Sequence, residues 1–316
     1  MITVLGLGSF GYAWLCYLDK NIPSKIQIRG WNRTSIISKH ISKNRSHLNI
    51  PSNMRLSKRV VVFDNAKDAV KNASIVVSAV SSEGVIPTLQ KIRYDVPKTA
   101  AFFNTAKALS PNGTYFCEEC EKYLPRGKQQ YGFIAGATKA ESLQRNKFST
   151  ATLAHPDVEK AKNIATKLSS DNVVLTPTTH VETTEIAGTS KNIISLLYGF
   201  MKGKKYSDTK VQHGFVELKK SFEETNLGLL KEELSPAWRT DVLMSAHSDT
   251  RNLSFGKKLA HNIHVNPEET VEGWESLQKT PQNNTLSNVP RVKASYDLLV
   301  TKKIGLEQWE ETMFTH

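Results

Sequence analysis

The feature that most constrains the fold is a glycine-rich hexapeptide, GLGSFG at residues 6–11, which directly follows an apolar run. The run Ile2–Leu5 is rich in β-branched residues and predicts a buried strand, and the apolar stretch 10–18 predicts a helix. In such a strand–turn–helix, the first glycine permits a tight turn, the second lets the backbone approach a pyrophosphate, and the third lets helix pack on strand. The helix N-terminus supplies N–H groups to the phosphates. We therefore predict dinucleotide binding by Gly6, Gly8, Ser9, Phe10 and Gly11; the alternative is a glycine-rich turn without a ligand.

Strand and helix signals alternate over about the first 150 residues, as expected for a parallel sheet. Further strands are predicted at 26–28, 60–63, 74–80, 99–104 and 131–135, and further helices at 66–71 and 115–123. After residue 175 the apolar spacing becomes helical, over 182–200, 211–230, 241–259 and 292–300. The sequence therefore predicts an α/β protein with a Rossmann-type domain at 1–178 and an all-helical substrate-binding domain at 179–316, joined by a hinge near 176–180.

The composition fits a globular protein of two domains. The chain has 316 residues, of which 39% are hydrophobic and 23% charged, which excludes a collagen-like or disordered chain. No apolar run approaches the length of a membrane span, and no basic segment precedes the first apolar residues as in a signal peptide. The three cysteines do not make a disulfide framework. We therefore expect a cytoplasmic protein without membrane insertion.

The charge is unevenly distributed. The net charge is +12, and residues 20–63 contain ten Lys or Arg but no Asp or Glu. A fold that prefers NAD usually places an acidic residue about 20 residues beyond the glycines, where it binds the adenosine ribose. Here the stretch 29–33 instead offers Arg29, Trp31 and Arg33, which suit a 2′-phosphate and stacking on adenine. We predict that Arg33 contacts that phosphate and that NADP is slightly preferred over NAD; a solvated basic loop is the alternative.

The helical half adds motifs that carry little weight singly. Lys191, taken alone, would be an ordinary surface lysine. In order along the chain, however, the whole set of motifs resembles the NAD(P)-dependent glycerol-3-phosphate dehydrogenases over almost the entire sequence. The set is GLGSFG, ASIVVSAVSS, NTAKA, AGATKAE, EIAGTSKN, TDVLMSAHSDTRN, VEG and VPRVKASYDLL.

This resemblance implies an oxidoreductase that interconverts dihydroxyacetone phosphate and sn-glycerol 3-phosphate for phospholipid synthesis. It implies a helical domain of the 6-phosphogluconate dehydrogenase C-terminal type, and a cleft that holds nicotinamide and substrate. By position, Lys191 matches the family's catalytic lysine, Asp241 the acid near it, and Lys107 the lysine that orients the substrate. A cationic neighbour such as Lys107 should lower the pKa of Lys191, which makes it a better acid or base, and Asp241 should oppose that shift.

The resemblance also assigns binding residues. The substrate phosphate and its surroundings are assigned to Arg251, Asn252, Asn192 and Ser245. The cofactor contacts are assigned to Ala140, Arg251 and Glu272, in addition to the glycine-rich turn. An arginine suits a phosphoryl dianion because its planar fork donates two parallel hydrogen bonds.

Several positions depart from the family pattern. Residues 237–240 replace a glycine-rich approach to the aspartate, Ser245 replaces a threonine, 137–139 lack the usual proline and aromatic residue, and alanines flank Lys107. These departures leave the substrate open, with a ketopantoate reductase or an opine dehydrogenase type as alternatives. A non-enzymatic nucleotide or nucleic-acid binding protein is a third reading of the basic segment, but few aromatic residues are interleaved with its cations.

No metal site is expected. Cys117 and Cys120 form a C-x-x-C, but the sequence has no second pair for a zinc site, and the two cysteines fall in an acidic predicted helix. We therefore expect a small phosphorylated substrate as the partner, and no nucleic acid. A homodimer stays open.

Overall fold

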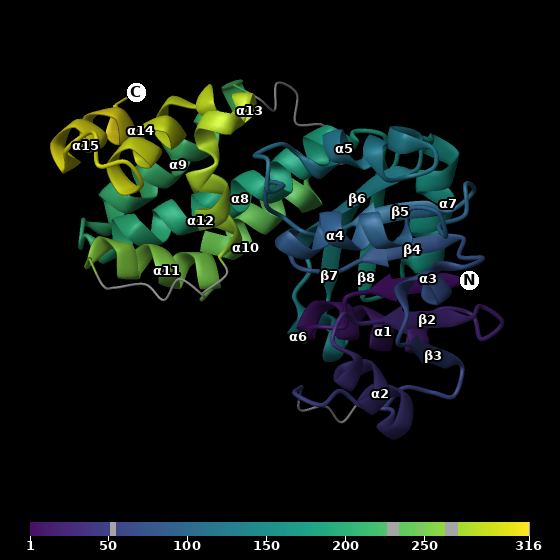
Figure 1. Cartoon of the computed structure of the whole chain (residues 1–316). Helices are drawn as coiled ribbons and strands as arrows, with labels where there is room; N and C mark the ends of the chain where they lie inside the picture. The colour runs from purple at the N-terminus through teal and green to yellow at the C-terminus, as the bar shows by residue number, and fades with distance from the viewer. Residues whose placement is uncertain (51–54, 226–233, 247, 263–270, 316) are drawn as a thin grey trace. The chain divides into compact units, whose positions relative to one another are not determined.

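The computed structural model describes residues 1–50, 55–225, 234–246, 248–262 and 271–315 (Figure 1). The chain divides into two compact units. The first comprises Met1–Ala106 and Phe116–Glu185, and the second comprises Lys107–Tyr115 and Ile186–His316. The division thus falls inside helix α8 (Val181–Gly203) rather than at residue 178, and a short earlier segment joins the second unit.

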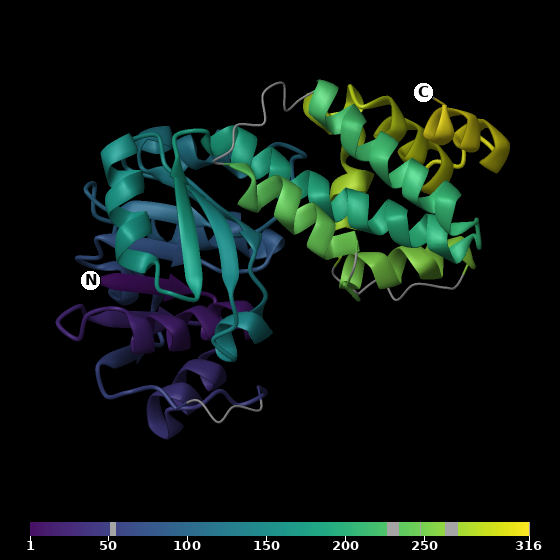
Figure 2. The ribbon, with the colours of Figure 1, turned by 180° about the vertical axis from the view of Figure 1, so that it is seen from behind.

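The first unit is built on one sheet with the strand order β3-β2-β1-β4-β5-β6-β7-β8 (Figures 1 and 2). Its strands are β1 Ile2–Leu5, β2 Ile28–Trp31, β3 Val60–Phe63, β4 Ile75–Ser78, β5 Ala101–Asn104, β6 Tyr131–Ala137, β7 Ser149–Ala154 and β8 Val173–Thr178. All neighbouring strands are parallel except β6 and β7, which are antiparallel. The order reverses between β1 and β4, and in open sheets of this kind ligands bind outside the carboxyl ends of the strands at that switch point.

Helices connect these strands and cover the sheet. They are α1 Ser9–Asn21, α2 Ser35–Asn44, α3 Ala66–Val70, α4 Ser82–Ile92, α5 Phe116–Glu119, α6 Ala140–Gln144 and α7 Val158–Leu168, with short 3₁₀ turns at Cys120–Lys122 and Gly127–Gln129. Strands β1, β4 and β5 are buried along their whole length, as expected for strands covered on both faces. The predicted Rossmann-type α/β unit is therefore confirmed, whereas β7 and its antiparallel pairing were not predicted.

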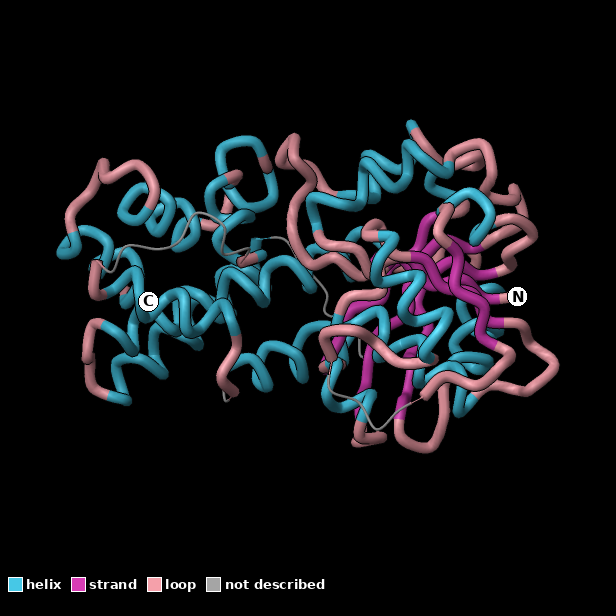
Figure 3. Tube along the Cα trace, turned by 60° about the horizontal axis from the view of Figure 1, so that its bottom comes forward, coloured by secondary structure: helices cyan, strands magenta, loops and turns pink. Residues whose placement is uncertain are grey.

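The second unit contains helices and no strand within its described residues (Figure 3). Besides most of α8 it contains α9 Asp208–Thr225, a π-helical turn Pro236–Thr240, α10 Asp241–Ala246, α11 Arg251–Ala260, α12 Glu272–Gln278, a 3₁₀ turn Thr280–Gln282, α13 Asn284–Ser287, α14 Pro290–Leu299 and α15 Leu306–Phe314. Residues 226–230 of the predicted helix 211–230 lie outside the described part of the chain. No helix that the structure describes is long and apolar enough to cross a membrane.

The single helix predicted over 241–259 is wrong. Helix α10 is Asp241–Ala246, and a separate helix, α11, starts at Arg251, because the Thr250 side chain accepts a hydrogen bond of 3.1 Å from the backbone N–H of Leu253 and so caps a new helix. Helix α11 then packs closely on α8. A Cβ at Gly199 would lie 2.1 Å from the Leu253 carbonyl oxygen, so the two backbones are in direct contact there.

Candidate active site

The glycine-rich turn lies between β1 and α1, and its three glycines have different roles. Gly6 has φ +85°, and a Cβ on it would come within 2.7 Å of Val80. A Cβ on Gly11 would lie 1.9 Å from the Gly6 carbonyl oxygen. These two glycines are therefore required by the turn and its packing. A Cβ on Gly8 would meet no described atom within 4 Å, so packing does not explain that glycine, whereas the approach of a phosphate would.

The first turn of α1 is suited to an anion. Gly8 is the N-cap, and among the described residues no side chain caps this helix, so its first N–H groups can bind an anion. Ser9 is exposed, and Phe10 is partly buried with its ring edge-on to Trp14. The residues predicted to bind the pyrophosphate therefore lie at this helix N-terminus.

Two side chains hold the glycine-rich turn at Leu7. The Leu7 N–H donates to Oδ1 of Asn32 at 3.0 Å, and Nε2 of His47 donates to the Leu7 carbonyl at 2.9 Å. Nδ1 of His47 accepts from the Asn49 N–H at 3.0 Å, which requires a neutral ring. Burial lowers the pKa of His47 and favours that neutral form. Neither residue was given a role from the sequence.

A pocket of about 320 Å³ opens beside the turn, at the switch point of the sheet. It is lined by Gly6, Gly8, Trp31, Asn32, Arg33, Thr34, Ala79, Val80, Ser81, Gly84, Pro87, Thr88 and Lys91. Arg33 is exposed and lines this pocket, whereas Arg29 is not part of the lining. Instead, Arg29 donates to the backbone carbonyls of Asp68 and Lys71 at 3.1 and 3.0 Å.

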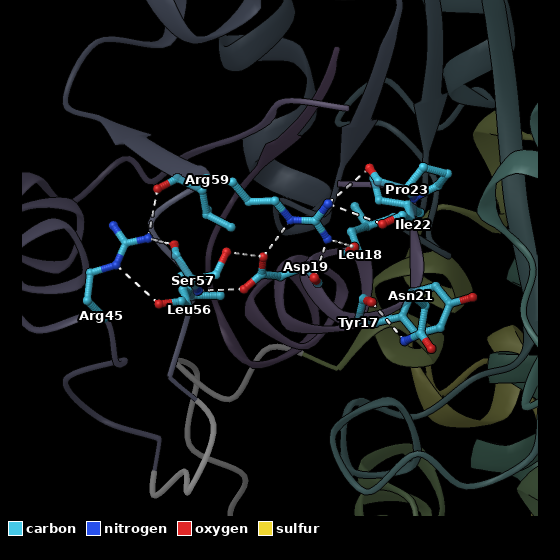
Figure 4. Close-up of polar contacts among 11 residues, drawn as sticks. Tyr17, Leu18, Asp19, Asn21, Ile22, Pro23, Arg45, Leu56, Ser57 and Arg59 are labelled. Atoms are coloured by element: carbon cyan, nitrogen blue, oxygen red, sulfur yellow. Dashed lines mark hydrogen bonds and ion pairs between the residues drawn. The ribbon is translucent and has the colours of Figure 1, made fainter. Parts of the chain in front are cut away.

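Other arginines of the basic segment also hold the chain rather than a ligand (Figure 4). Arg45 donates to the carbonyls of Leu56, Ser57 and Val60. Arg59 forms an ion pair of 2.9 Å with Asp19 and also donates to carbonyls at the end of α1 and just beyond it. The predicted electropositive region is therefore in part a set of internal contacts, and this weakens the nucleic-acid reading.

Removing Arg59 should destabilise the first unit. Burial alone would raise the pKa of Asp19, but hydrogen bonds from Ser57 and Arg59 lower it below its ordinary value. We expect Arg59→Met to lower the free energy of unfolding by about 2–4 kcal/mol, because the Asp19 carboxylate loses its ion pair and keeps its hydrogen bonds from Ser57, while several carbonyls lose their donor. Urea denaturation at neutral pH measures this, with the exposed neighbour Lys58→Met as a control. A loss below about 1 kcal/mol would contradict it.

The same pair predicts a pH dependence with a definite sign. Because the folded pKa of Asp19 is lowered, its contribution to stability is present above the unfolded pKa of the carboxyl group and is lost as the pH falls through the folded pKa. The difference in stability between the protein and the Arg59→Met variant should therefore shrink in acid.

The centre of the second unit is a carboxylate shared by two lysines. Asp241, the first residue of α10, is fully buried. Its Oδ2 lies 2.6 Å from Nζ of Lys107, and its Oδ1 lies 3.3 Å from Nζ of Lys191. The structure therefore brings together the three residues that we predicted as catalytic, although they are far apart in the sequence.

The environment of Lys191 changes its acidity. Burial is the largest cause and lowers the pKa of Lys191; Asp241 opposes this shift, and Lys107 lowers the pKa further. The direction agrees with the prediction, but the dominant cause is desolvation rather than the second cation. Nζ of Lys191 also donates to Oγ of Ser245 at 3.3 Å, so the serine hydroxyl lies at the same site.

Three further site residues form a network in which Asn192 and Asn252 are buried and Glu272 is partly buried. The Glu272 carboxylate accepts from the Lys107 backbone N–H at 3.2 Å and from Nδ2 of Asn192 at 2.9 Å. Asn192 also donates to the Lys107 carbonyl at 3.0 Å. Nδ2 of Asn252 donates to Oδ1 of Asn192 at 3.0 Å, and the Gly273 N–H donates to Oδ1 of Asn252 at 2.9 Å. These contacts fix the backbone on both sides of Lys107, a positioning role that the sequence did not predict.

Arg251 and Ala140 lie outside these networks. Arg251 is the first residue of α11, and its exposed side chain forms no ion pair with any described carboxylate. Ala140 begins α6 in the first unit and packs against the hydrophobic core there.

The departures from the family pattern form local structure around Asp241. The π-helical turn Pro236–Thr240 leads directly into α10. Within this turn Trp238 is fully buried, and its indole N–H donates to Glu223 at 2.9 Å. This large side chain therefore holds the segment that positions Asp241.

The C-x-x-C shows no sign of reactivity. Cys117 and Cys120 are both buried, and burial raises the pKa of each thiol, that of Cys120 to about 12. Since the thiolate is the reactive form, neither sulfur is activated. Within the described ranges, no group of three or more His, Cys, Asp or Glu side chains could hold a metal ion.

Comparison with known proteins identifies both units. Residues 1–161 match the model of the NAD-dependent glycerol-3-phosphate dehydrogenase N-terminus, and residues 180–309 match that of the C-terminus. A glycerol-3-phosphate dehydrogenase [NAD(P)+] of Syntrophomonas wolfei is 29% identical over 66% of this chain, a match that spans 60% of that relative. One of Corynebacterium glutamicum is 22% identical over 97% of this chain and 90% of its own length.

A solved structure shows the same fold. The glycerol-3-phosphate dehydrogenase of Coxiella burnetii aligns over 100% of this chain and 98% of its own, with a TM-score of 0.81 and 16% identity. The family models and this fold confirm the resemblance seen in the motifs, the predicted fold class and the dependence on NAD or NADP. The chain therefore belongs to the NAD-dependent glycerol-3-phosphate dehydrogenase family.

Proposed function

We propose that this protein reduces dihydroxyacetone phosphate to sn-glycerol 3-phosphate with NADPH or NADH and so supplies glycerol phosphate for phospholipid synthesis. The observation that carries this proposal is the buried carboxylate of Asp241 with Lys107 and Lys191 on its two oxygens. Lys191 and Asp241 lie in the range that matches the family's C-terminal model, and Lys107 lies in the range that matches its N-terminal model. We place the enzyme in the cytoplasm; a homodimer stays a prediction.

Lys191 is the acid of the reduction. The reduced nicotinamide supplies the hydride. The Lys191 ammonium donates a proton to the carbonyl oxygen as that oxygen becomes an alkoxide, and the neutral amine takes the proton back in the reverse direction. Burial lowers the pKa of Lys191 and brings it nearer to working pH, while Asp241 keeps the amine in place.

The remaining residues of the second unit bind and orient the substrate. Lys107 is held by Asp241 through its side chain and by Glu272 through its backbone, so its ammonium has a fixed place from which to orient the carbonyl group. Arg251 has no carboxylate partner in the described chain and is free to bind the phosphate, with Asn252, Asn192 and Ser245 supporting the site. A phosphorylated substrate would explain why this arginine has no carboxylate partner in the described chain better than an uncharged substrate would.

The first unit binds the nucleotide. The pyrophosphate binds at the glycine-rich turn, to Gly6, Gly8, Ser9, Phe10 and Gly11. Arg33 binds the adenosine end of the cofactor in the pocket of about 320 Å³. Since the lining includes Arg33 and no acidic residue among the described side chains, we assign a slight preference for NADP over NAD. We also assign Ala140 and Glu272 as contacts of the cofactor.

A steady-state assay tests the proposal. Purified protein is mixed with dihydroxyacetone phosphate, and the oxidation of NADPH and of NADH is followed in parallel, with ketopantoate as the competing substrate. We expect turnover with dihydroxyacetone phosphate and a lower KM for NADPH than for NADH. Turnover of ketopantoate alone would overturn the substrate, and equal KM values for the two cofactors would overturn the cofactor preference only.

A further inference from the structure

The nucleotide pocket has a second cation that the sequence did not indicate. Lys91 lies in the last turn of α4 and lines the pocket together with Arg33, which follows β2. Both side chains are exposed. Two elements that are far apart in the sequence therefore each bring a positive charge to one pocket.

A contact with an aromatic ring holds Lys91 at this position. Its Nζ lies 5.4 Å from the centre of the Trp31 ring, within the range of a cation–π interaction. Trp31 is itself fixed, because it is only 3% exposed and its indole N–H donates to the Asp64 carbonyl at 3.2 Å. The ammonium is therefore held over an indole that itself lines the pocket. The negative end of the α4 dipole would favour a lysine there in any orientation.

Neither cation of the pocket is paired with a carboxylate that the structure describes. None of the residues that line it is acidic, and neither Arg33 nor Lys91 forms an ion pair with a carboxylate of the described chain. The other arginines of the basic segment discussed above donate to carbonyls or to Asp19 instead. Two like charges that share a pocket repel each other unless an anion binds between them. The pocket therefore presents two positive charges to a ligand and favours an anionic one.

We infer that Lys91 is a second specificity-determining residue, which binds the 2′-phosphate of NADP together with Arg33. This inference rests on the proposed assignment of the pocket to the adenosine end of the cofactor. A phosphomonoester carries up to two negative charges at neutral pH and has three acceptor oxygens, so it can bind a guanidinium and an ammonium at once. The unmodified ribose of NAD has no negative charge and no phosphate oxygens at this position.

Binding of cofactor fragments tests the inference without any turnover. Adenosine 2′,5′-bisphosphate and 5′-AMP differ only in the 2′-phosphate, and calorimetry measures the affinity of each. We expect Lys91→Met to weaken 2′,5′-bisphosphate binding by about 10- to 150-fold, the range for one charge-assisted contact, and to leave 5′-AMP binding within about threefold. Lys91→Arg should retain most of the affinity, and Lys98→Met, which removes an exposed lysine outside this pocket, should change neither ligand.

The possible results separate this inference from the proposed function. Equal losses for both fragments, or no loss for the 2′,5′-bisphosphate in a folded variant, would overturn the role of Lys91. Wild-type protein that binds neither fragment would overturn it as well. The wild-type protein could fail to turn over dihydroxyacetone phosphate while Lys91→Met selectively weakens binding of the 2′,5′-bisphosphate. That result would support the role of Lys91 and reject the proposed reaction. Combining Lys91→Met with Arg33→Met should give a non-additive loss, because both cations act on one phosphate.

Discussion

Replacing Lys191 by alanine is expected to lower kcat for the reduction of dihydroxyacetone phosphate by about 10²–10⁴-fold, the usual effect of losing a general acid. In the structure, Nζ of Lys191 lies between Asp241 and Ser245 and is largely buried, so the variant removes the proton donor that we assign to the carbonyl oxygen. Lys202→Ala is the matched control, because it removes an exposed lysine from the last turn of the same helix. Thermal melting of both variants excludes unfolding as the cause.

The pH profile distinguishes a catalytic from a purely structural role of Lys191. Reduction needs the protonated ammonium, so its rate should fall as the pH rises through the pKa of Lys191, which burial lowers below the ordinary value for lysine. Oxidation of glycerol 3-phosphate needs the neutral amine and should rise over the same range. In Lys191→Ala, both the fall in the reduction rate and the rise in the oxidation rate should be absent. Near-normal kcat in a folded variant, or an unchanged pH profile, would remove Lys191 from the mechanism.

The sequence predicted the features that depend on local pattern. The turn at Gly6–Gly11 and its flanking strand and helix could be identified because their glycines, β-branched residues and apolar run lie within a few positions of one another. Strand β3 was placed at its observed limits. The strand predicted at 26–28 begins and ends too near the N-terminus, and the observed strand β2 is Ile28–Trp31. The prediction stopped at Ile28 because Arg29 and Gly30 have no strand signal of their own.

Features set by tertiary context were missed. Strand β7 is Ser149–Ala154, with the sequence STATLA. Its small and hydroxyl side chains are typical of loops, and the segment is a strand because it pairs with β6 and β8 in the sheet. The break between α10 and α11 interrupts apolar spacing that continues through it, and only the capping threonine marks it. The short segment Lys107–Tyr115 joins the second unit through contacts such as that of the Leu109 N–H with Ser276, which no local pattern reveals.

The site was predicted through the resemblance rather than through the residues alone. Lys107, Lys191 and Asp241 come from three separate stretches, and nothing in their spacing requires them to meet. The network of Glu272, Asn192 and Asn252 escaped prediction for the same reason, because each of these residues was considered only as a ligand contact. Lys91 was missed because α4 and the end of β2 come together only at the switch point of the sheet.

Replacing Arg251 by alanine should lower kcat/KM for dihydroxyacetone phosphate by about 30- to 1,000-fold, or roughly 2–4 kcal/mol, through loss of a bidentate charge-assisted contact with the phosphate. Arg251 is the first residue of α11, and its exposed guanidinium forms no ion pair in the part of the chain that the structure describes. The helix itself should persist in the variant, because Thr250 still caps it and alanine is a good helix former. A change in substrate affinity can therefore be separated from a change in fold.

Unphosphorylated dihydroxyacetone provides the decisive comparison for Arg251. It has the reacting carbonyl but no phosphate, so Arg251→Ala and the unmodified enzyme should turn it over at similar, low rates. Arg251→Lys keeps the charge without the planar fork and should recover only part of the loss with the phosphorylated substrate. Lys257→Ala removes another exposed cation of α11 and controls for net charge. Equal losses with and without the phosphate would show that Arg251 acts elsewhere, and a raised KM for NADPH alone would assign it to the cofactor.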